Sequence, residues 1–328
     1  YRRHGHNEGD DPKFTQPTMY ELIDAHKNPR EIYLAKLIER GDVDAKVGEE
    51  LEKSFWSELQ DRLDMVKQKV LPYKYQEPEQ HWRQLKKTID TADMVNPVTG
   101  VSKKDADKIL SHLMNLPKDF NPNSKIKRLQ KSKQELLDKG LIDWSFGELM
   151  AYGSIMLEGK NVRMSGQDVK RGTFSHRHAV FFDEKTNKGY NRLNTMDGAK
   201  GKYLIYNSLL SEFAVLGFEY GYSQASPDHL AIWEAQFGDF YNGAQTIVDQ
   251  FISAGESKWQ RMSGLIMLLP HGMEGQGPEH SSARMERFLQ NCANFNMLVC
   301  QVTTPANLFH MIRRQLALPY RKPLIHMS

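Results

Sequence analysis

Glu212 is the side chain whose place in the sequence most directly suggests chemistry, because it follows an apolar, strand-like run and begins a helical pattern. Ser211 can cap that helix, and the helix dipole favours a carboxylate in its first turn. These effects alone would explain a glutamate at this position. The functional alternative is a carboxylate that is held at the end of a strand and directed into a cleft. The local sequence is compatible with both.

Two more polar segments directly follow predicted strands. Residues 165–178 hold Gln167 and Asp168 among many other hydrogen-bonding groups, which favours a binding loop over a merely solvated one. The segment after the third predicted strand holds Phe237 and Phe240. Their rings could stack on a planar heterocycle, although aromatic residues more often belong to the core.

Residues 270–284 follow a fourth strand and combine His271 and His280 with several glycines and a helix start. This combination suits an anionic substrate. Gly275 and Gly277 resemble the start of a dinucleotide-binding fingerprint, but His280 stands where the third glycine belongs. We therefore reject a nicotinamide site.

Other common sites lack their sequence patterns. His176 and His178 are two residues apart without an HExxH motif, so no metal site is predicted in this chain. A serine hydrolase would show a G-x-S-x-G motif, and the sequence has none.

The composition is that of a globular protein, with 39% hydrophobic and 26% charged residues in 328. A net charge of +3 is too small to indicate nucleic acid or an anionic membrane as the main partner. No run of 18 apolar residues predicts a membrane span. Cys292 and Cys300 without CxxC spacing indicate a reducing compartment and no disulfide framework. The opening Tyr1 and the apolar last residues suggest a segment of a longer polypeptide.

From Asp143 onward, short apolar strands alternate with helical patterns. Strands are predicted at 162–164, 203–207, 230–234, 265–269, 297–302 and 324–327, and helices at 147–158, 212–221, 243–254, 282–292 and 305–317. This alternation predicts an α/β fold with a mostly parallel sheet flanked by helices. Ligands of such sheets gather at the carboxyl ends of the strands, where all the polar segments above lie.

The preceding residues are expected to be helical and to pack against something larger. Residues 1–25 show little periodicity and are interpreted as an ordered loop. A capping box at Asn28 and a stop at Gly41 delimit one helix. Apolar residues spaced by three or four predict a second helix from Val47 to Val70, and Ser102 begins another.

Long strings of this sequence resemble one family, the thiamine-diphosphate-dependent E1 component of the 2-oxoglutarate dehydrogenase complex. The matching strings are Tyr1–Glu8 with Phe14–Pro17, Ser165–His178, Ser208–Tyr222, Trp233–Gln245 and Leu268–Arg287. The resemblance implies a transketolase-like pyrimidine-binding domain over residues 125–328. It also implies a helical connector over 26–124, and the end of a diphosphate-binding domain in residues 1–25.

The resemblance also implies roles for the residues singled out above. Glu212 would hydrogen-bond the ring nitrogen N1′ of the aminopyrimidine, and Phe240, or alternatively Phe237, would stack on that ring. His6 and His280 would act as acid–base or hydrogen-bonding groups on the substrate side, where His271 also belongs. The cofactor pocket would further include Gln167 or Asp168.

The implied cofactors are thiamine diphosphate and Mg²⁺. The Gly-Asp-Gly motif that would bind the metal and the diphosphate is absent here, so the Mg²⁺ ligands are expected upstream. The implied reaction is oxidative decarboxylation of 2-oxoglutarate with succinyl transfer to the lipoyl group of an E2 partner, by a homodimer. The implied location is the cytoplasm in a bacterium or the mitochondrial matrix in a eukaryote. Alternatives are 2-oxoadipate as substrate, non-oxidative decarboxylation, or a non-catalytic assembly module.

Overall fold

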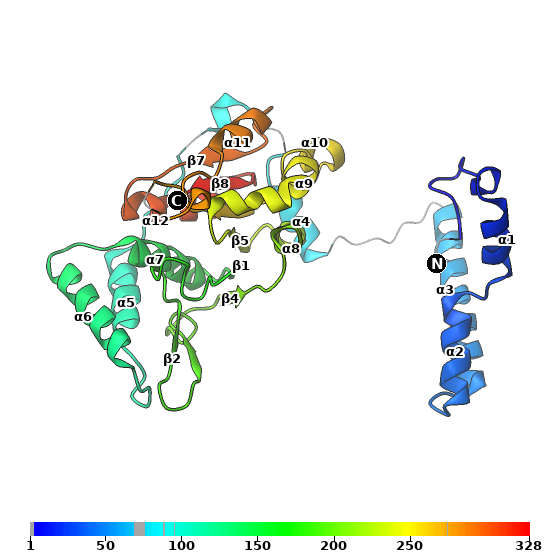
Figure 1. Ribbon diagram of the computed structural model, residues 1–328, viewed down its shortest axis with the longest axis horizontal. Helices are drawn as coiled ribbons and strands as arrows, with labels where there is room; N and C mark the ends of the chain where they lie inside the picture. The colour runs from blue at the N-terminus through cyan, green and yellow to red at the C-terminus, as the bar shows by residue number, and fades with distance from the viewer. Residues whose placement is uncertain (1–2, 69–75, 88, 95, 274) are drawn as a thin grey trace. The chain divides into compact units, whose positions relative to one another are not determined.

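The computed structural model describes residues 3–68, 76–87, 89–94, 96–273 and 275–328. The chain divides into two compact units, Tyr1–Lys74 and Tyr75–Ser328, which are described separately (Figure 1). Among the residues in these ranges, no helix is long and apolar enough to cross a membrane.

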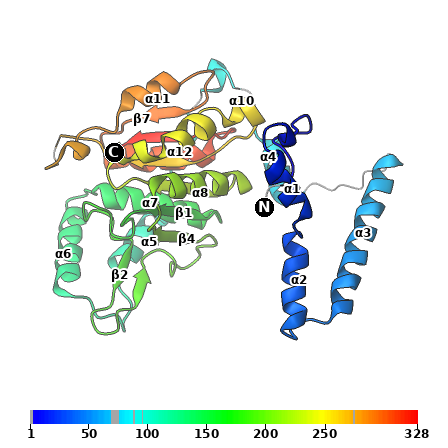
Figure 2. The same ribbon diagram turned by 45° about the vertical axis from the view of Figure 1, so that its right-hand side comes forward.

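The first unit is helical. It contains the short 3-10 turn η1 (Pro12–Phe14) and the helices α1 (Pro17–Ala25), α2 (Pro29–Glu39) and α3 (Ala45–Lys67) (Figure 2). The interpretation of residues 1–25 as a loop is wrong for the second half of that segment, which forms α1. Pro17 stands in the first turn and presets the helical φ, and Tyr20 is the buried residue of this short helix.

The predicted start of α2 is confirmed in detail. Asn28 accepts a hydrogen bond from the Glu31 backbone N–H at 2.9 Å, and Glu31 Oε2 accepts one from the Asn28 N–H at 3.3 Å. Gly41 adopts a φ of +74°, a conformation that favours glycine, just beyond the helix end. The predicted helix from Val47 corresponds to α3, whereas its expected end at Val70 lies outside the described residues.

The second unit begins with helices and continues as the predicted α/β alternation. Its leading elements are α4 (Glu77–Gln84), η2 (Thr91–Asp93), α5 (Lys103–Met114), α6 (Ser124–Asp138) and α7 (Trp144–Leu157). Ile109 and Leu113 of α5 are buried in the same core cluster as α7 and the sheet. This part of the predicted connector therefore packs directly against the sheet domain.

Six strands form one parallel sheet in the order β4-β1-β5-β6-β8-β7, which confirms the predicted parallel α/β architecture. The strands are β1 (Val162–Gly166), β4 (Tyr203–Asn207), β5 (Leu230–Glu234), β6 (Ile266–Leu269), β7 (Leu298–Cys300) and β8 (Leu324–Met327). Each lies within or close to a range predicted from the sequence.

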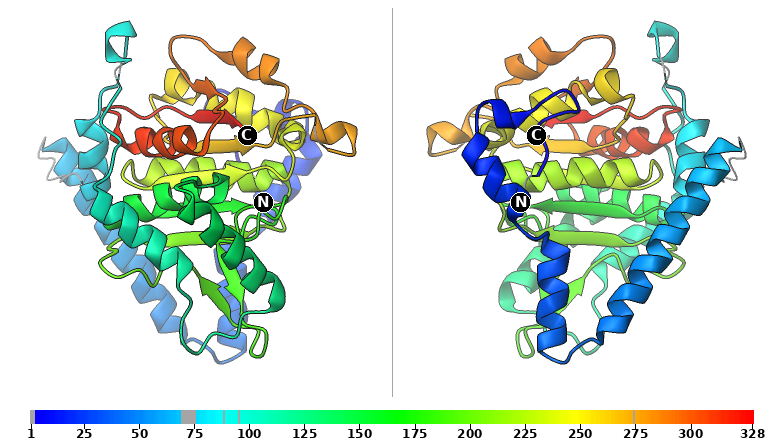
Figure 3. Two further views of the ribbon diagram at one scale, coloured as in Figure 1. Left: turned by 90° about the vertical axis from the view of Figure 1, so that its left-hand side faces the viewer. Right: turned by 90° about the vertical axis from the view of Figure 1, so that its right-hand side faces the viewer.

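Helices cover both faces of this sheet (Figure 3). One core cluster joins the sheet to α5, α7 and α12 (Pro305–Ala317). The other joins it to α8 (Glu212–Ala225), the helical segment after Gly238, and α11 (Met285–Asn291). The central strands β5, β6 and β8 are buried along their whole length, as expected for parallel strands that are covered on both faces.

Three details differ from the sequence prediction. The helix expected over 243–254 is built from a 3-10 turn η3 (Gly238–Ala244), α9 (Gln245–Ile247) and a π-helical turn η4 (Val248–Ile252), before α10 (Gly255–Trp259). The helix expected from Ser282 begins at Met285, after a 3-10 turn η5 (Pro278–His280). An antiparallel hairpin of β2 (Val180–Phe182) and β3 (Gly189–Asn191) was not predicted, because each strand has only three residues.

Candidate functional site

The register of the sheet brings the carboxyl ends of four strands to one edge. Gly166, the last residue of β1, pairs with Asn207 at the end of β4 and with Glu234 at the end of β5. Glu234 in turn pairs with Leu268 of β6. The four polar segments that follow these strands therefore emerge side by side, as predicted.

Glu212 is the first residue of α8 and lies at this edge. Ser211 caps the helix by accepting a hydrogen bond from the Ala214 N–H at 3.4 Å. The Glu212 side chain is half-buried and faces Gly243, where an added Cβ would lie 3.7 Å from Oε2. Within the part of the chain that the structure describes, this carboxylate has no hydrogen bond or ion pair. The start of α8 fixes the position of the Glu212 carboxylate, and no cationic side chain in the described residues neutralises its charge.

Phe237 is the centre of an aromatic cluster at the same edge. Its ring lies 5.7 Å from that of Phe174 and 5.5 Å from that of Phe240, both edge-on, and His280 stacks on it at 4.0 Å. Both Phe237 and Phe240 are half-buried. The cluster thus joins the segments after β1, β5 and β6, which the sequence separates by more than a hundred residues.

The two histidines of the segment after β6 have defined tautomers. His280 Nδ1 accepts a hydrogen bond from the Gln276 N–H at 3.2 Å, and its Nε2 lies 3.3 Å from Glu279 Oε1. His271 Nδ1 accepts one from the Ala283 N–H at 2.9 Å. In each neutral ring the proton is therefore on Nε2. His280 is stacked in the aromatic cluster, whereas His271 holds the loop to its own helix start.

The segment after β1 places its two predicted residues differently. Asp168 adopts a φ of +59° and is ion-paired with Arg171, whose Nε donates to Asp168 Oδ2 at 2.9 Å. Gln167 is exposed. Asp168 thus already has a partner within its own turn, whereas the Gln167 side chain has no hydrogen bond to any residue in the described ranges.

Sequence reasoning missed a buried ion network beneath this loop. Arg177 is 1% exposed and donates to both carboxylate oxygens of Glu148 at 3.0 and 2.9 Å, and to Glu234 Oε1 at 2.8 Å. Arg177 also donates to the Val169 carbonyl at 3.0 Å. Burial opposes the charge of Arg177, but the two carboxylates outweigh it and raise the pKa of the guanidinium.

This network ties the loop to the end of β5 and to α7. One cation with two carboxylates leaves a net charge of −1 among buried groups. The available signal was the arginine between His176 and His178 in a polar loop that was predicted to bind a ligand. Its two acidic partners lie 29 and 57 residues away in the chain, so only the fold identifies them.

His6, predicted on the substrate side, belongs to the first unit. It is exposed, and its backbone N–H donates to Asp10 Oδ2 at 2.6 Å. The structure does not place it relative to the strand ends of the second unit, so its predicted role stays a prediction. Within the described ranges, no group of three His, Cys, Asp or Glu side chains could hold a metal ion.

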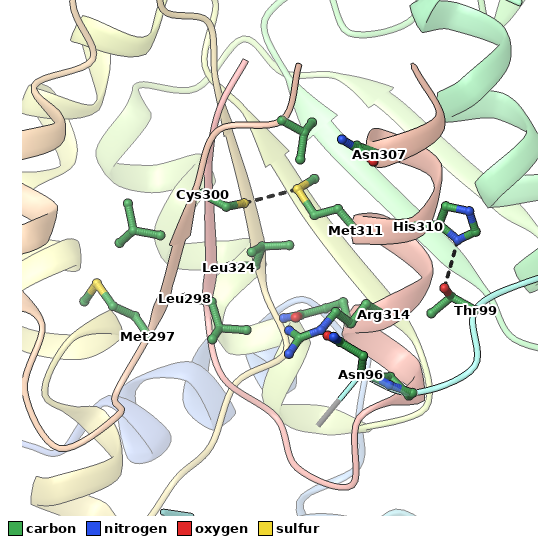
Figure 4. A pocket seen from close by; sticks show the side chains of 14 residues that line it. Asn96, Thr99, Met297, Leu298, Cys300, Asn307, His310, Met311, Arg314 and Leu324 are labelled. Atoms are coloured by element: carbon green, nitrogen blue, oxygen red, sulfur yellow. Dashed lines mark hydrogen bonds between the residues drawn. The ribbon is translucent and has the colours of Figure 1, made fainter. Parts of the chain in front are cut away.

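A separate cavity lies beside the edge strand β7 and helix α12 (Figure 4). It has a volume of about 580 Å³ and contains none of the predicted site residues. Cys300 Sγ lies 3.2 Å from Met311 Sδ on its wall, and burial raises the pKa of this thiol to about 11. Cys300 is therefore a protonated, unreactive side chain at neutral pH.

Comparison with known proteins agrees with this geometry. Residues 141–328 match the transketolase pyrimidine-binding domain, and residues 1–74 match the dehydrogenase E1 component. The chain is 49% identical over its whole length to the 2-oxoglutarate dehydrogenase E1 component of Brucella anthropi and 48% identical to that of Brucella canis. It spans about a third (33%) of the length of these relatives.

The matched regions include the strand ends and every loop of the candidate site. The parallel sheet and the family match therefore rest on the same residues. This chain belongs to the transketolase pyrimidine-binding domain family, and it is similar over its full length to 2-oxoglutarate dehydrogenase E1 components.

Proposed function

We propose that this chain supplies the pyrimidine-binding half of a thiamine-diphosphate site in a 2-oxoglutarate dehydrogenase E1 component. The whole protein would decarboxylate 2-oxoglutarate oxidatively and pass the succinyl group to a lipoyl group on an E2 partner. The observation that carries this proposal is the half-buried Glu212 carboxylate without a partner among the described residues, at the same carboxyl edge of a parallel sheet as the aromatic cluster.

The residues present fit the pyrimidine end of this cofactor. Glu212 would share a proton with ring nitrogen N1′, and Phe240 or Phe237 would offer a flat apolar face. Gly243 keeps the space beside the Glu212 carboxylate free of a side chain. When bound, thiamine diphosphate supplies a carbon nucleophile and an electron sink for decarboxylation.

The chain's own polar groups would then act on the substrate. His280 carries its proton on Nε2, which lies 3.3 Å from Glu279 Oε1. A keto or carboxylate oxygen of the substrate would replace Glu279 as the acceptor of that proton. His271 presents an Nε2–H in the same loop. His6 and either Gln167 or Asp168 complete the proposed set. The Mg²⁺ ligands are proposed to lie in a part of the protein outside this chain.

An exposed apolar face supports a homodimer. Leu209 is fully exposed, and Leu210, Phe213 and Phe218 are more than 45% exposed on the turn after the edge strand β4 and on α8. Such a patch is typical of a surface that another chain covers. We expect Leu209→Asp to shift the full-length protein toward monomer in analytical ultracentrifugation, whereas the exposed Leu141→Asp should leave the dimer intact.

The catalytic assignment is tested with Glu212→Ala in the full-length protein that contains this chain. We expect turnover of 2-oxoglutarate with an artificial electron acceptor to fall about 10²-fold or more, as for a positioned acid–base group. The matched control is Glu184→Ala, because Glu184 is an exposed carboxylate in the β2–β3 turn whose side chain also has no hydrogen bond among the described residues.

Two results would contradict the assignment. Unchanged turnover in Glu212→Ala would remove Glu212 from the site, and a wild-type protein that binds no thiamine diphosphate would favour an assembly module. The choice between 2-oxoglutarate and 2-oxoadipate needs kcat/KM for both, since one methylene changes binding by only about 1–3 kcal/mol.

A further inference from the structure

An ion pair joins the segments that follow β5 and β6. Arg284 Nε donates a hydrogen bond to Asp239 Oδ1 at 3.0 Å, although 45 positions separate the two residues in the chain. Asp239 lies between Phe237 and Phe240 in the sequence, and Arg284 lies four residues after His280. The pair therefore connects the backbone that carries the aromatic cluster with the backbone that carries the histidine.

The backbone of Arg284 is strained. Its φ of +53° lies in the left-handed region, which residues other than glycine rarely adopt. The side chain makes no capping hydrogen bond to α11, which begins at the next residue, and is directed to Asp239 instead. Strained backbone persists only where the surrounding contacts hold it, and such residues are frequent at functional sites.

Two further contacts hold the same segments together. The backbone N–H of Gly238 donates to the Pro270 carbonyl at 2.9 Å. A Cβ added at Gly238 would lie 2.5 Å from the Ala283 Cβ, so a larger residue would push the segments apart. The third contact is the stack of His280 on Phe237. Together with the ion pair, each of three consecutive residues after β5 thus contacts the segment after β6.

The ion pair is suited to fix geometry and adds little to stability. The side chains of Arg284 and Asp239 are 44% and 20% exposed, so solvent screens their attraction. A charge-assisted hydrogen bond still has a narrow range of lengths, and it sets how far apart its partners lie. His280 is on the same short segment as Arg284. A shift of that segment would therefore move the imidazole relative to the strand ends.

We propose that Arg284 is a positioning residue, which holds His280 against the aromatic cluster through its ion pair with Asp239. The inference rests on the function proposed above, in which His280 donates a proton to the substrate. Arg284 touches neither substrate nor cofactor and acts only through His280. Its effect on the rate is large because a displacement of about 1 Å can slow a positioned group about 10²-fold.

The test uses Arg284→Gly in the full-length protein, because glycine accepts the left-handed backbone and removes the side chain. We expect kcat for 2-oxoglutarate, measured with an artificial electron acceptor, to fall about 10-fold with little change in KM. Tm should stay near the wild-type value, since relief of the strain offsets the loss of a screened ion pair.

The matched control for the backbone is Gln260→Gly. Gln260 has a φ of +54° at the end of α10, and its side chain is exposed. This variant relieves the same kind of strain away from the site, so kcat should equal that of the wild type.

Two further variants separate positioning from a structural role. Asp239→Asn removes the charge of the other partner at nearly unchanged shape, and a similar fall in kcat is expected even if Arg284→Gly folds poorly. In a His280→Gln background, Arg284→Gly should lower kcat by less than about 2-fold, because residues that act as a unit give non-additive effects. A merely structural role would lower Tm and would not depend on His280.

Wild-type kcat in Asp239→Asn, or in Arg284→Gly where it folds, overturns this inference. So does a further loss of about 10-fold when Arg284→Gly is added to His280→Gln, because Arg284 would then act independently of the histidine. Wild-type kcat in His280→Gln alone contradicts the proposed function instead, since it removes the acid–base role of His280.

Discussion

The imidazole of His280 lies flat against the ring of Phe237, with 4.0 Å between ring centroids and 15° between ring planes. His280 follows β6 and Phe237 follows β5, so the stack joins two loops of the candidate site. It also covers one face of Phe237, whereas Phe240 meets Phe237 edge-on. The geometry therefore favours Phe240 as the ring available to a planar ligand and gives Phe237 a supporting position.

This difference predicts distinct behaviour for two alanine variants. Phe240→Ala should raise the Kd for thiamine diphosphate about 10-fold, since a stacked aromatic pair contributes about 0.5–1.5 kcal/mol beyond its buried area. Its Tm should change little. Phe237→Ala removes contacts to three rings, so it should lower Tm as well as binding. Binding calorimetry and thermal unfolding of both variants check this, and equal Kd values would assign the stacking role to neither ring alone.

The close approach of β1 and β5 at the site predicts a severe effect of Gly166→Ala. Gly166 has a φ of +153°, and a Cβ there would lie 2.1 Å from the Glu234 carbonyl oxygen. The two strand ends would have to separate, at a cost of about 1–3 kcal/mol in the free energy of unfolding. Denaturant unfolding measures this cost.

The matched control is Gly221→Ala. Gly221 is exposed in α8 with nothing within 4 Å of an added Cβ, so alanine should stabilise the helix by about 0.5–1 kcal/mol. If both variants lost the same stability, steric conflict at Gly166 would not be the cause.

The parallel strands and the loops after them could be predicted from the sequence, because the spacing of apolar residues and the length of each apolar run are local properties. The edge position of Glu212 followed from the apolar run that ends at Asn207. The partners of Arg177 could not be predicted, since pairing with Glu148 and Glu234 depends on how α7 and β5 pack.

The buried ion network predicts a large loss of stability on removal of its cation. Arg177→Met would leave Glu148 and Glu234 buried without a cation, although Tyr152 still donates to Glu148, and we expect a cost of about 3–5 kcal/mol. The control in the same loop is Arg171→Met, because Arg171 is exposed and its pair with Asp168 contributes at most about 1 kcal/mol. Chemical denaturation of both variants makes the comparison. A loss below 1 kcal/mol for Arg177→Met would show that the two carboxylates take up protons or are otherwise relieved.

Buried histidines predict a loss of stability in mild acid. His326 is 1% exposed in β8, and burial lowers its pKa despite the Cys300 carbonyl and Glu148, which act in the opposite direction. The folded protein therefore binds this proton at lower pH than the unfolded chain, whose histidine pKa is about 6.5. Stability from this group is fully present above about pH 6.5 and is lost as pH falls toward the folded pKa, by about 1.4 kcal/mol per pH unit for one proton.

Tm measured between pH 8 and 5 should decline below 6.5, and His326→Gln should flatten that decline. If His326→Gln kept the wild-type dependence of Tm on pH, other groups would have to take up the protons. His112 and His178 are such groups, because burial lowers the pKa of each.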